Sequence, residues 1–165
     1  MLIVFGDLPG TGKTTIAQKV AGAFTATYFR VNAIGQVPRS ADVLCTDARP
    51  VGYAVAQTIT EAKLGGFRAI VADCFNQVQV SRDGWRAVAR RTGARLLEVK
   101  IVCSDTQEHE RLVRARRTDI SGIVLPSWET VQRLECHRWD WPHLVVDTAT
   151  MSASKAVARL MQILS

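Results

Sequence analysis

The residues best suited to chemistry lie near the N-terminus, where a glycine-rich segment leads into a lysine and two threonines. The segment reads Asp7-Leu8-Pro9-Gly10-Thr11-Gly12-Lys13-Thr14-Thr15. Residues 12–14 match the last three positions of the phosphate-binding signature GxxxxGK(S/T). Glycines let the backbone turn its N–H groups inward around phosphate oxygens, and a helix that starts at Lys13 adds the partial positive charge of its N-terminus. The segment therefore predicts a site for the triphosphate of a nucleotide.

The polar residues of this segment have separate expected roles. Lys13 is expected to reach the β and γ phosphates, the Thr14 hydroxyl to ligate Mg²⁺, and Thr15 to touch the α phosphate. The rest of the predicted nucleotide-binding set is Leu8, Pro9, Gly10, Thr11 and Gly12. Asp7 stands where the signature has its first glycine, so its carboxylate either weakens the binding of a polyanion or turns outward from the loop. The competing interpretation is a glycine turn that only joins a strand to a helix.

Strands and helices alternate along the chain and position this segment. Short apolar or β-branched runs predict strands at 2–5, 26–31, 69–72, 96–102 and 143–146. Helices are predicted from Lys13, over 51–64 and 81–92, from an Asp105 N-cap with Glu108 as its partner, from Ser127 to about His137, and over 152–164. In the helix 51–64, the side chains expected to face inward are Val55, Ile59 and Ala62. The alternation implies a parallel sheet with helices on both faces, joined by right-handed crossovers.

Length and composition are those of an ordinary globular protein. The 165 residues suit one domain. Apolar residues make up 47% of the sequence and charged residues 22%, and the sequence has no low-complexity tract or internal repeat. The only apolar run at the N-terminus, 2–5, is far shorter than the ~20 residues of a membrane helix, so a cytoplasmic protein without a membrane partner is expected. The cysteines Cys45, Cys74, Cys103 and Cys136 form no CxxC pair, which favours reduced thiols over a zinc site.

The net charge of +6 suits an anionic ligand. Arginines gather at 82–95 and 111–117, which is often only a solvated helix face. Binding of nucleic acid would need stacking aromatics among the basic residues, and no Phe, Trp or Tyr lies between Arg86 and Arg117. The sequence therefore argues against nucleic acid as a partner.

A resemblance to known proteins extends over five segments, which read LPGTGKTT, YFRVNAI, VADCFN, VCSDTQEHERLVRARRTDI and HLVVDTA. Together they resemble the small P-loop kinases of the adenylate-kinase-like group, whose members include chloramphenicol phosphotransferase, adenylylsulfate kinase, the kinase part of polynucleotide kinase and the zeta-toxin kinases. The resemblance implies one P-loop NTPase domain over 1–165, with a three-layer α/β fold and a five-stranded parallel sheet in the order 2-3-1-4-5. It also implies transfer of the γ-phosphate of MgATP to an acceptor, and a preference for ATP over GTP.

Two further polar residues take roles from this resemblance. Asn32 stands where these kinases commonly have an aspartate that orients or deprotonates the acceptor hydroxyl. An amide cannot take a proton, so Asn32 either orients the acceptor or is only a turn former at a strand end. Asp73 follows a buried strand, at the edge where ligands of open α/β sheets collect. It is expected to organise Mg²⁺ with Thr14, and the structural alternative is that it caps the following loop.

The second arginine cluster resembles the lid arginines of these kinases. Arg114 and Arg117 fall on neighbouring parts of one helix face, and closure of a lid at about 112–124 is expected to bring them over the γ-phosphate. For any single arginine of the cluster, a solvated basic face is the competing explanation.

The remaining ring side chains carry no clear motif. The histidines His109, His137 and His143 show no spacing for a triad or a metal site, so surface or packing roles are expected. The tryptophans Trp128, Trp139 and Trp141 are expected to pack the last helix against the sheet or, alternatively, to wall an acceptor pocket.

These observations favour an ATP-dependent kinase of a small hydroxyl-bearing molecule that the sequence does not identify. The alternative is a nucleotide-binding switch or slow ATPase without kinase activity, which Asp7 and Asn32 favour. A nucleic-acid end kinase is a minor alternative that rests on charge alone. The oligomeric state does not follow from the sequence.

Overall fold

The computed structural model describes residues 1–34, 49–66, 69–117 and 124–164. The strands are β1 (Leu2–Gly6), β2 (Thr27–Arg30), β3 (Ile70–Asp73), β4 (Leu96–Val102) and β5 (Leu144–Asp147). The helices are α1 (Lys13–Ala23), α2 (Val31–Ile34), α4 (Arg49–Leu64), α5 (Gln79–Thr92), α6 (Thr106–Ala115), α7 (Trp128–Gln132) and α8 (Ala153–Leu164). In the part of the chain just defined, no helix is both long and apolar enough to cross a membrane.

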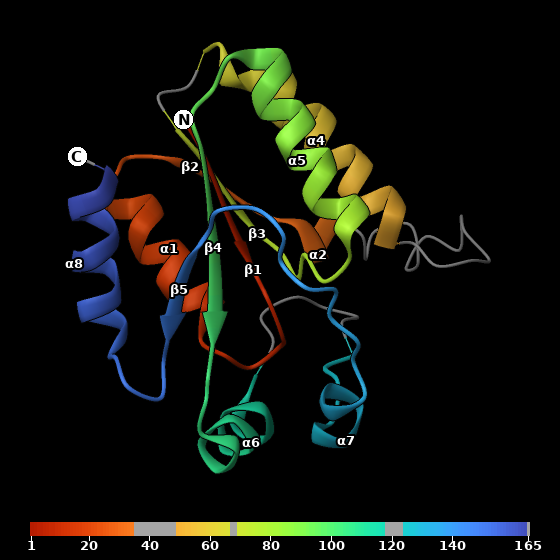
Figure 1. Cartoon of the computed structure of the whole chain (residues 1–165), viewed down its shortest axis with the longest axis vertical. Helices are drawn as coiled ribbons and strands as arrows, with labels where there is room; N and C mark the ends of the chain where they lie inside the picture. Colours follow the sequence, from red (N-terminus) through yellow and green to blue (C-terminus); the bar gives the residue numbers. More distant parts are fainter. Residues whose placement is uncertain (35–48, 67–68, 118–123, 165) are drawn as a thin grey trace.

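The strands form one parallel sheet in the order β2-β3-β1-β4-β5, which confirms the expected fold. Helices α1 and α8 cover one face, and α4 and α5 cover the other (Figure 1). The central strand β1 is apolar on both sides: Ile3 and Phe5 pack toward α1 and α8, whereas Leu2 and Val4 pack toward α4 and α5. Because β1 is central, the loop that follows it lies in the middle of the carboxyl edge of the sheet, where α6 and α7 also lie (Figure 1).

The orientation of α4 differs from the expectation. Val55 and Ile59 were expected to face inward but are 41% and 37% exposed, and Ala62 is exposed as well. The buried face is formed instead by Gly52, Ala56, Thr60 and Leu64. The small residues of this face let α4 approach its neighbours α2 and α5 closely. The exposed and the buried residues of α4 recur with the same helical period, one position apart. The more apolar of the two sets, which contains Val55 and Ile59, faces outward.

Two element boundaries also need correction. The second strand ends at Arg30, and Val31 already begins the short helix α2. Helix α7 was expected to reach about His137 but ends at Gln132. Beyond Gln132 the backbone bonds to another segment: the His137 amide donates to the Gln77 carbonyl at 2.9 Å. The backbone bond to Gln77, in the loop after β3, replaces the helical pattern there.

The expected N-cap of α6 and the expected free thiols are both found in the described residues. The Asp105 carboxylate accepts from the amides of Gln107 and Glu108 and so caps α6. The Glu108 carboxylate pairs with Arg111, so the expected reciprocal contact is replaced by an ion pair. The cysteines in the described residues, Cys74, Cys103 and Cys136, are free thiols, and Cys45 lies outside the described residues.

The tryptophans do not pack the last helix, so that expectation is wrong. The buried side chains of α8, Ala156, Leu160 and Leu164, join the cluster that α1 and β1 share. Trp128 packs instead with Val113 and Val131 between α6 and α7. Trp139 lies beside Gly6 and Arg82, and Trp141 is 55% exposed.

A buried ion pair joins α5 to the sheet. The Arg86 guanidinium donates to both carboxylate oxygens of Glu98, at 3.2 and 3.0 Å, and the two side chains are 6% and 0% exposed. Arg86 also bonds Asp83 and Asp140 at 3.1 Å each. The pair therefore fixes the register of α5 against β4.

A Glu98→Ala variant is expected to lose about 3–5 kcal/mol of unfolding free energy, because it leaves a buried guanidinium without its main partner. Urea denaturation followed by circular dichroism measures this loss. The matched control is Glu61→Ala, which breaks the two-bond pair with Arg91 on the surface and should leave the denaturation midpoint close to that of the parent protein. Equal midpoints for the two variants would contradict the assignment.

Candidate nucleotide-binding site

Residues 7–15, called the phosphate loop below, curl from the end of β1 back over the start of α1. Gly10 and Gly12 both have left-handed backbones, with φ of 85° and 82°. A Cβ on Gly10 would lie 2.4 Å from Val113 Cγ2, so only glycine fits beneath α6. Gly12 is the N-cap of α1, and no side chain caps that helix. The first amides of α1 are therefore left for a ligand, as in other anion sites at helix N-termini.

Asp7 has a backbone conformation that favours glycine, with a φ of 114°, which accounts for the glycine of the signature at this position. Its side chain is 7% exposed. One carboxylate oxygen accepts from the Leu8 amide at 2.9 Å, and the other lies 3.7 Å from Lys100 Nζ of β4. The carboxylate is thus turned toward β4 and paired there.

The backbone at Asp7 gives a prediction about stability. Asp7→Gly is expected to be more stable than Asp7→Ala by about 1–2 kcal/mol, because alanine is strained at this φ and glycine is not. Both variants lose the same carboxylate, so its contacts cancel in the comparison, which thermal or urea denaturation measures. At an ordinary backbone conformation the order would be reversed, and a more stable alanine variant would therefore refute a left-handed Asp7.

Lys13 is buried at the centre of the loop. Its ammonium donates to the Leu8 carbonyl at 3.1 Å and lies 5.6 Å from the centroid of the Phe75 ring. Burial lowers the pKa of Lys13; the charge of Asp73 opposes this shift and that of Arg116 adds to it. A bound polyanion would favour the charged form, so the site is built to gain from phosphate binding.

Thr14 and Asp73, the two expected metal ligands, are in direct contact. The Thr14 hydroxyl donates to Asp73 Oδ2 at 2.7 Å, and the Tyr28 hydroxyl donates to the same oxygen at 2.8 Å. Asp73 is 2% exposed and so is held firmly. Mg²⁺ prefers oxygen ligands and usually takes one or two carboxylates with waters and phosphates, which fits this pair. No group of three or more His, Cys, Asp or Glu side chains with metal-site geometry occurs within the described ranges.

Tyr28 was not foreseen from the sequence. It lies on β2, which pairs with β3 so that Arg30 is opposite Asp73. Its contact with Asp73 depends on this pairing across 45 positions of sequence, and no local motif announces it. Asn32 lies in α2, directly after β2, and is half-buried. It is therefore at the same edge of the sheet as Asp73. Thr15 is exposed on the first turn of α1.

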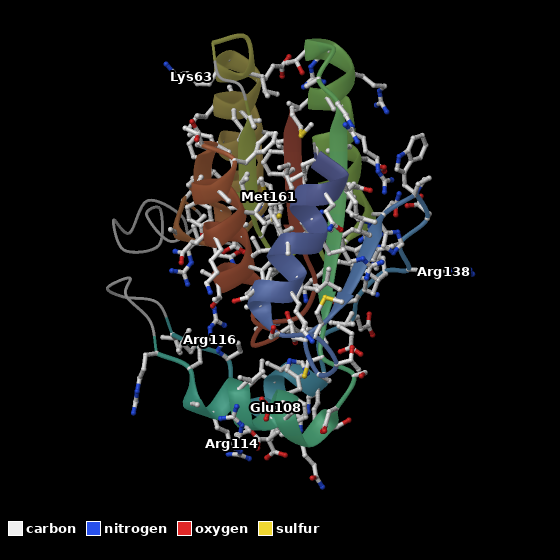
Figure 2. All side chains as sticks on the ribbon, turned by 90° about the vertical axis from the view of Figure 1, so that its left-hand side faces the viewer. Lys63, Glu108, Arg114, Arg116, Arg138 and Met161 are labelled. Carbon is white, nitrogen blue, oxygen red and sulfur yellow. The ribbon has the colours of Figure 1, made fainter. Side chains whose placement is uncertain are left out.

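The arginines of α6 and of the residues directly after it differ in the direction in which they point. Arg114 is 59% exposed and bonds Glu110 at 2.8 Å and Glu129 at 3.4 Å. Figure 2 shows Arg114 on the outer side of α6 and Arg116 on the side that faces α1. Arg117 is exposed and is the last described residue before 118–123, so this central part of the expected lid lies outside the described residues.

Arg116 shares the electrostatic environment of the phosphate loop. Burial lowers the pKa of Arg116; the charge of Arg30 lowers it further, and that of Asp73 raises it. Its charge in turn acts on Lys13. Arg116 also borders an open pocket of about 340 Å³ between α6 and α7. The lining of this pocket is Val113, Arg114, Arg116, Leu125, Pro126, Ser127 and Trp128. Trp128 therefore lines this pocket.

Besides Lys13, three side chains hold carbonyl groups of the phosphate loop. His109 contacts the Pro9 carbonyl at 2.8 Å, the Thr148 hydroxyl donates to the Thr11 carbonyl at 3.0 Å, and the Thr11 hydroxyl donates to that of Leu8 at 3.2 Å. His109 is buried, in accordance with a packing role.

No family model and no curated protein matches the sequence. In structure, the chain is similar to a sugar kinase from Janibacter sp. HTCC2649, with a TM-score of 0.71 and 17% identity over 99% of this chain and 93% of that one. The chain has the fold of the small P-loop kinases.

Two further structures with this fold contain nucleotide ligands. The APS kinase of Mycobacterium tuberculosis in complex with AMPPNP and APS has a TM-score of 0.68 and 17% identity, over 99% of this chain and 96% of that one. Kti12 of Chaetomium thermophilum in complex with ADP-AlF3 has a TM-score of 0.67 and 17% identity, over the whole of both chains. At such identities the likeness establishes the P-loop kinase fold and leaves the reaction of this chain to its own residues.

Proposed function

We propose that the protein is an ATP-dependent phosphotransferase that moves the γ-phosphate of MgATP to a hydroxyl group of a small molecule. The observation that carries this proposal is the 2.7 Å bond between Thr14 and Asp73 beside the phosphate loop. It joins an anion site at a helix start to a pair of oxygens suited to Mg²⁺. The similar structures that are described as a sugar kinase and as an APS kinase with AMPPNP support the same reaction class.

In this proposal the loop amides and Lys13 bind the phosphates. The Lys13 ammonium leaves the Leu8 carbonyl and turns to the β and γ phosphates, a short movement because both groups belong to the same loop. Thr14 and Asp73 would hold Mg²⁺, which supplies charge neutralisation at the phosphate oxygens when bound. Tyr28 keeps Asp73 Oδ2 oriented toward Thr14.

We assign the cation over the transferred phosphate first to Arg116. It faces the interior of the site and its charge already acts on Lys13 and Asp73. Phosphoryl transfer depends mainly on positioning and on charge stabilisation, which a guanidinium supplies well. Arg114 and Arg117, which the resemblance favours, would have to turn inward when residues 112–124 close.

The acceptor would approach the γ-phosphate from the side of α2, where Asn32 lies. The Asn32 amide can orient a hydroxyl by hydrogen bonding but cannot remove its proton. This residue is the specific reason to keep a second candidate function, a nucleotide-binding switch or slow ATPase. The two functions differ in whether an acceptor accelerates the formation of ADP.

The deciding experiment measures ADP release from MgATP with and without a library of hydroxyl-bearing sugars, nucleosides, antibiotics and sulfonucleotides. Mass spectrometry then searches for a product that is heavier by one phosphoryl group. A phosphorylated product supports the kinase, and nucleotide binding without any product from the library or from cell extract supports the switch. Asn32→Asp separates the roles of this residue, because a rise in product formation would show that a missing base limits the reaction.

A further inference from the structure

We infer that His109 of α6 is a positioning residue for phosphate binding: its hydrogen bond to the Pro9 carbonyl orients the Pro9–Gly10 peptide so that the Gly10 amide faces the phosphate site. This inference rests on the proposed binding of nucleotide phosphates by the phosphate loop. It assigns a role in that site to a side chain 100 positions away in the sequence.

The position of the proton on the His109 ring follows from the partner of Nε2. His109 Nε2 lies 2.8 Å from the Pro9 carbonyl oxygen, and the side chain is 6% exposed. A carbonyl oxygen has no proton to give, so Nε2 must carry the hydrogen and donate it. The ring stands edge-on to Trp128, with centroids 5.1 Å apart and an interplanar angle of 77°. The contact with Trp128 keeps the imidazole in the orientation from which it donates.

The geometry of the peptide links the Pro9 carbonyl to the Gly10 amide. A trans peptide is planar, and its C=O and N–H groups point in opposite directions. A donor that fixes the Pro9 carbonyl therefore also fixes the Gly10 N–H, and turns it away from α6. Gly10 lacks a Cβ and has a φ of 85°, a position at which the chain itself restrains the backbone least. The hydrogen bond from His109 therefore restrains the Pro9–Gly10 peptide, which glycine by itself leaves free to rotate.

The Leu8 carbonyl is held in a different way from the Pro9 carbonyl. The Leu8 carbonyl accepts from Lys13 at 3.1 Å, and this bond is lost when the ammonium turns to the phosphates. The bond from His109 uses no group that the phosphates need, so it persists in the bound state. It can therefore hold the loop open for the ligand both before and after binding.

The same face of α6 makes a second contact with the loop. Val113 lies one turn after His109 and covers Gly10, where an added Cβ would come within 2.4 Å of Val113 Cγ2. Arg116 follows three positions later, at the C-cap of α6, so these three residues lie along one side of the helix. The packing of α6 on the loop thus fixes both the orientation of the Gly10 amide and the position of Arg116.

The test compares three substitutions at one position. His109→Phe keeps a ring against Trp128 but has no donor, His109→Gln places an amide donor near the site of Nε2, and His109→Asn has a donor that is too short. Calorimetric titration with MgATP is expected to show about tenfold weaker binding for the Phe and Asn variants, and binding within about threefold of the parent for the Gln variant. If the Phe variant does not fold, the Gln and Asn variants decide.

The control is His143→Phe. His143 contacts the Trp141 carbonyl at 2.7 Å but lies in the segment before β5, so its replacement should leave the affinity for MgATP unchanged. Equal affinities for the Phe variant and the parent would overturn the inference. Equal losses for the Gln and Asn variants would do so too, because they would show that the shape of the ring matters and not its donor.

A second measurement needs no nucleotide and keeps this inference separate from the proposed function. In the free protein, the ¹⁵N order parameter of the Gly10 amide is expected to fall in His109→Phe and to be restored in His109→Gln. An unchanged order parameter would overturn the positioning role. If the parent protein itself fails to bind MgATP, the proposed function is refuted, while the Gly10 measurement still decides whether His109 holds this peptide.

Discussion

A Lys13→Ala variant is expected to lose at least about a thousandfold in ATP turnover, the scale seen when one preorganised charge donor is removed from a site of developing negative charge. The structure explains why the effect should be so large: the Lys13 ammonium is buried in the loop and within the field of Asp73 and Arg116. Coupled detection of ADP measures the loss. The fold should survive, because Lys13 makes only one hydrogen bond to the described residues, to Leu8; an active Lys13→Ala enzyme would remove the basis of the proposed site.

The lowered pKa of Lys13 adds a test in which two quantities move in opposite directions with pH. Affinity for nucleotide should fall as pH rises through the folded-state pKa, because the ammonium loses its charge. Stability should rise in the same window, which lies between that value and the ordinary pKa of 10.5, because the unfolded chain binds more protons there. Differences between the parent and Lys13→Ala isolate this residue from other titrating groups. A difference that does not vary with pH would contradict the buried, perturbed ammonium.

Arg116→Ala is expected to slow phosphoryl transfer by about a thousandfold, whereas Arg114→Ala should change it by less than about threefold. The reason is their placement: Arg116 acts on Lys13 and Asp73, and Arg114 is an exposed partner of Glu110 and Glu129. The two variants remove the same side chain two positions apart, so each is the control for the other. Steady-state kinetics with saturating MgATP measures the difference.

The reverse order of effects would mean that Arg114 turns inward when residues 112–124 close. Such a result would restore the assignment that the resemblance favours. It would leave the proposed reaction intact and change only which guanidinium lies over the transferred phosphate.

The sequence predicts best those features that are local. The run 2–5, the glycines after it and the helix from Lys13 each follow from a few adjacent residues, and together they announce the phosphate loop. The strand order came from the resemblance and is confirmed. The predictions that were wrong concern how elements face each other. In α4, for example, Val55 points outward because the smaller residue Ala56 allows closer packing against the neighbouring helices.

The same limit applies within the site. The spacing of α6 identifies a basic cluster, but which arginine faces inward depends on which side of α6 contacts the loop. A signal was present, because His109, Val113 and Arg116 recur at helical intervals and two of them are suited to burial. Tyr28 carried no such signal, since its contact with Asp73 arises only when β2 and β3 pair.

The central place of β1 also bears on when the site can form during synthesis. Its partners are β3 and β4, and the contacts of the loop include Lys100, His109 and Thr148. The phosphate loop therefore has its full set of contacts only after the ribosome has synthesised residues up to Thr148, and such long-range pairing slows folding. A nascent chain that stops before α6 should contain the residues of the phosphate loop but should not bind ATP.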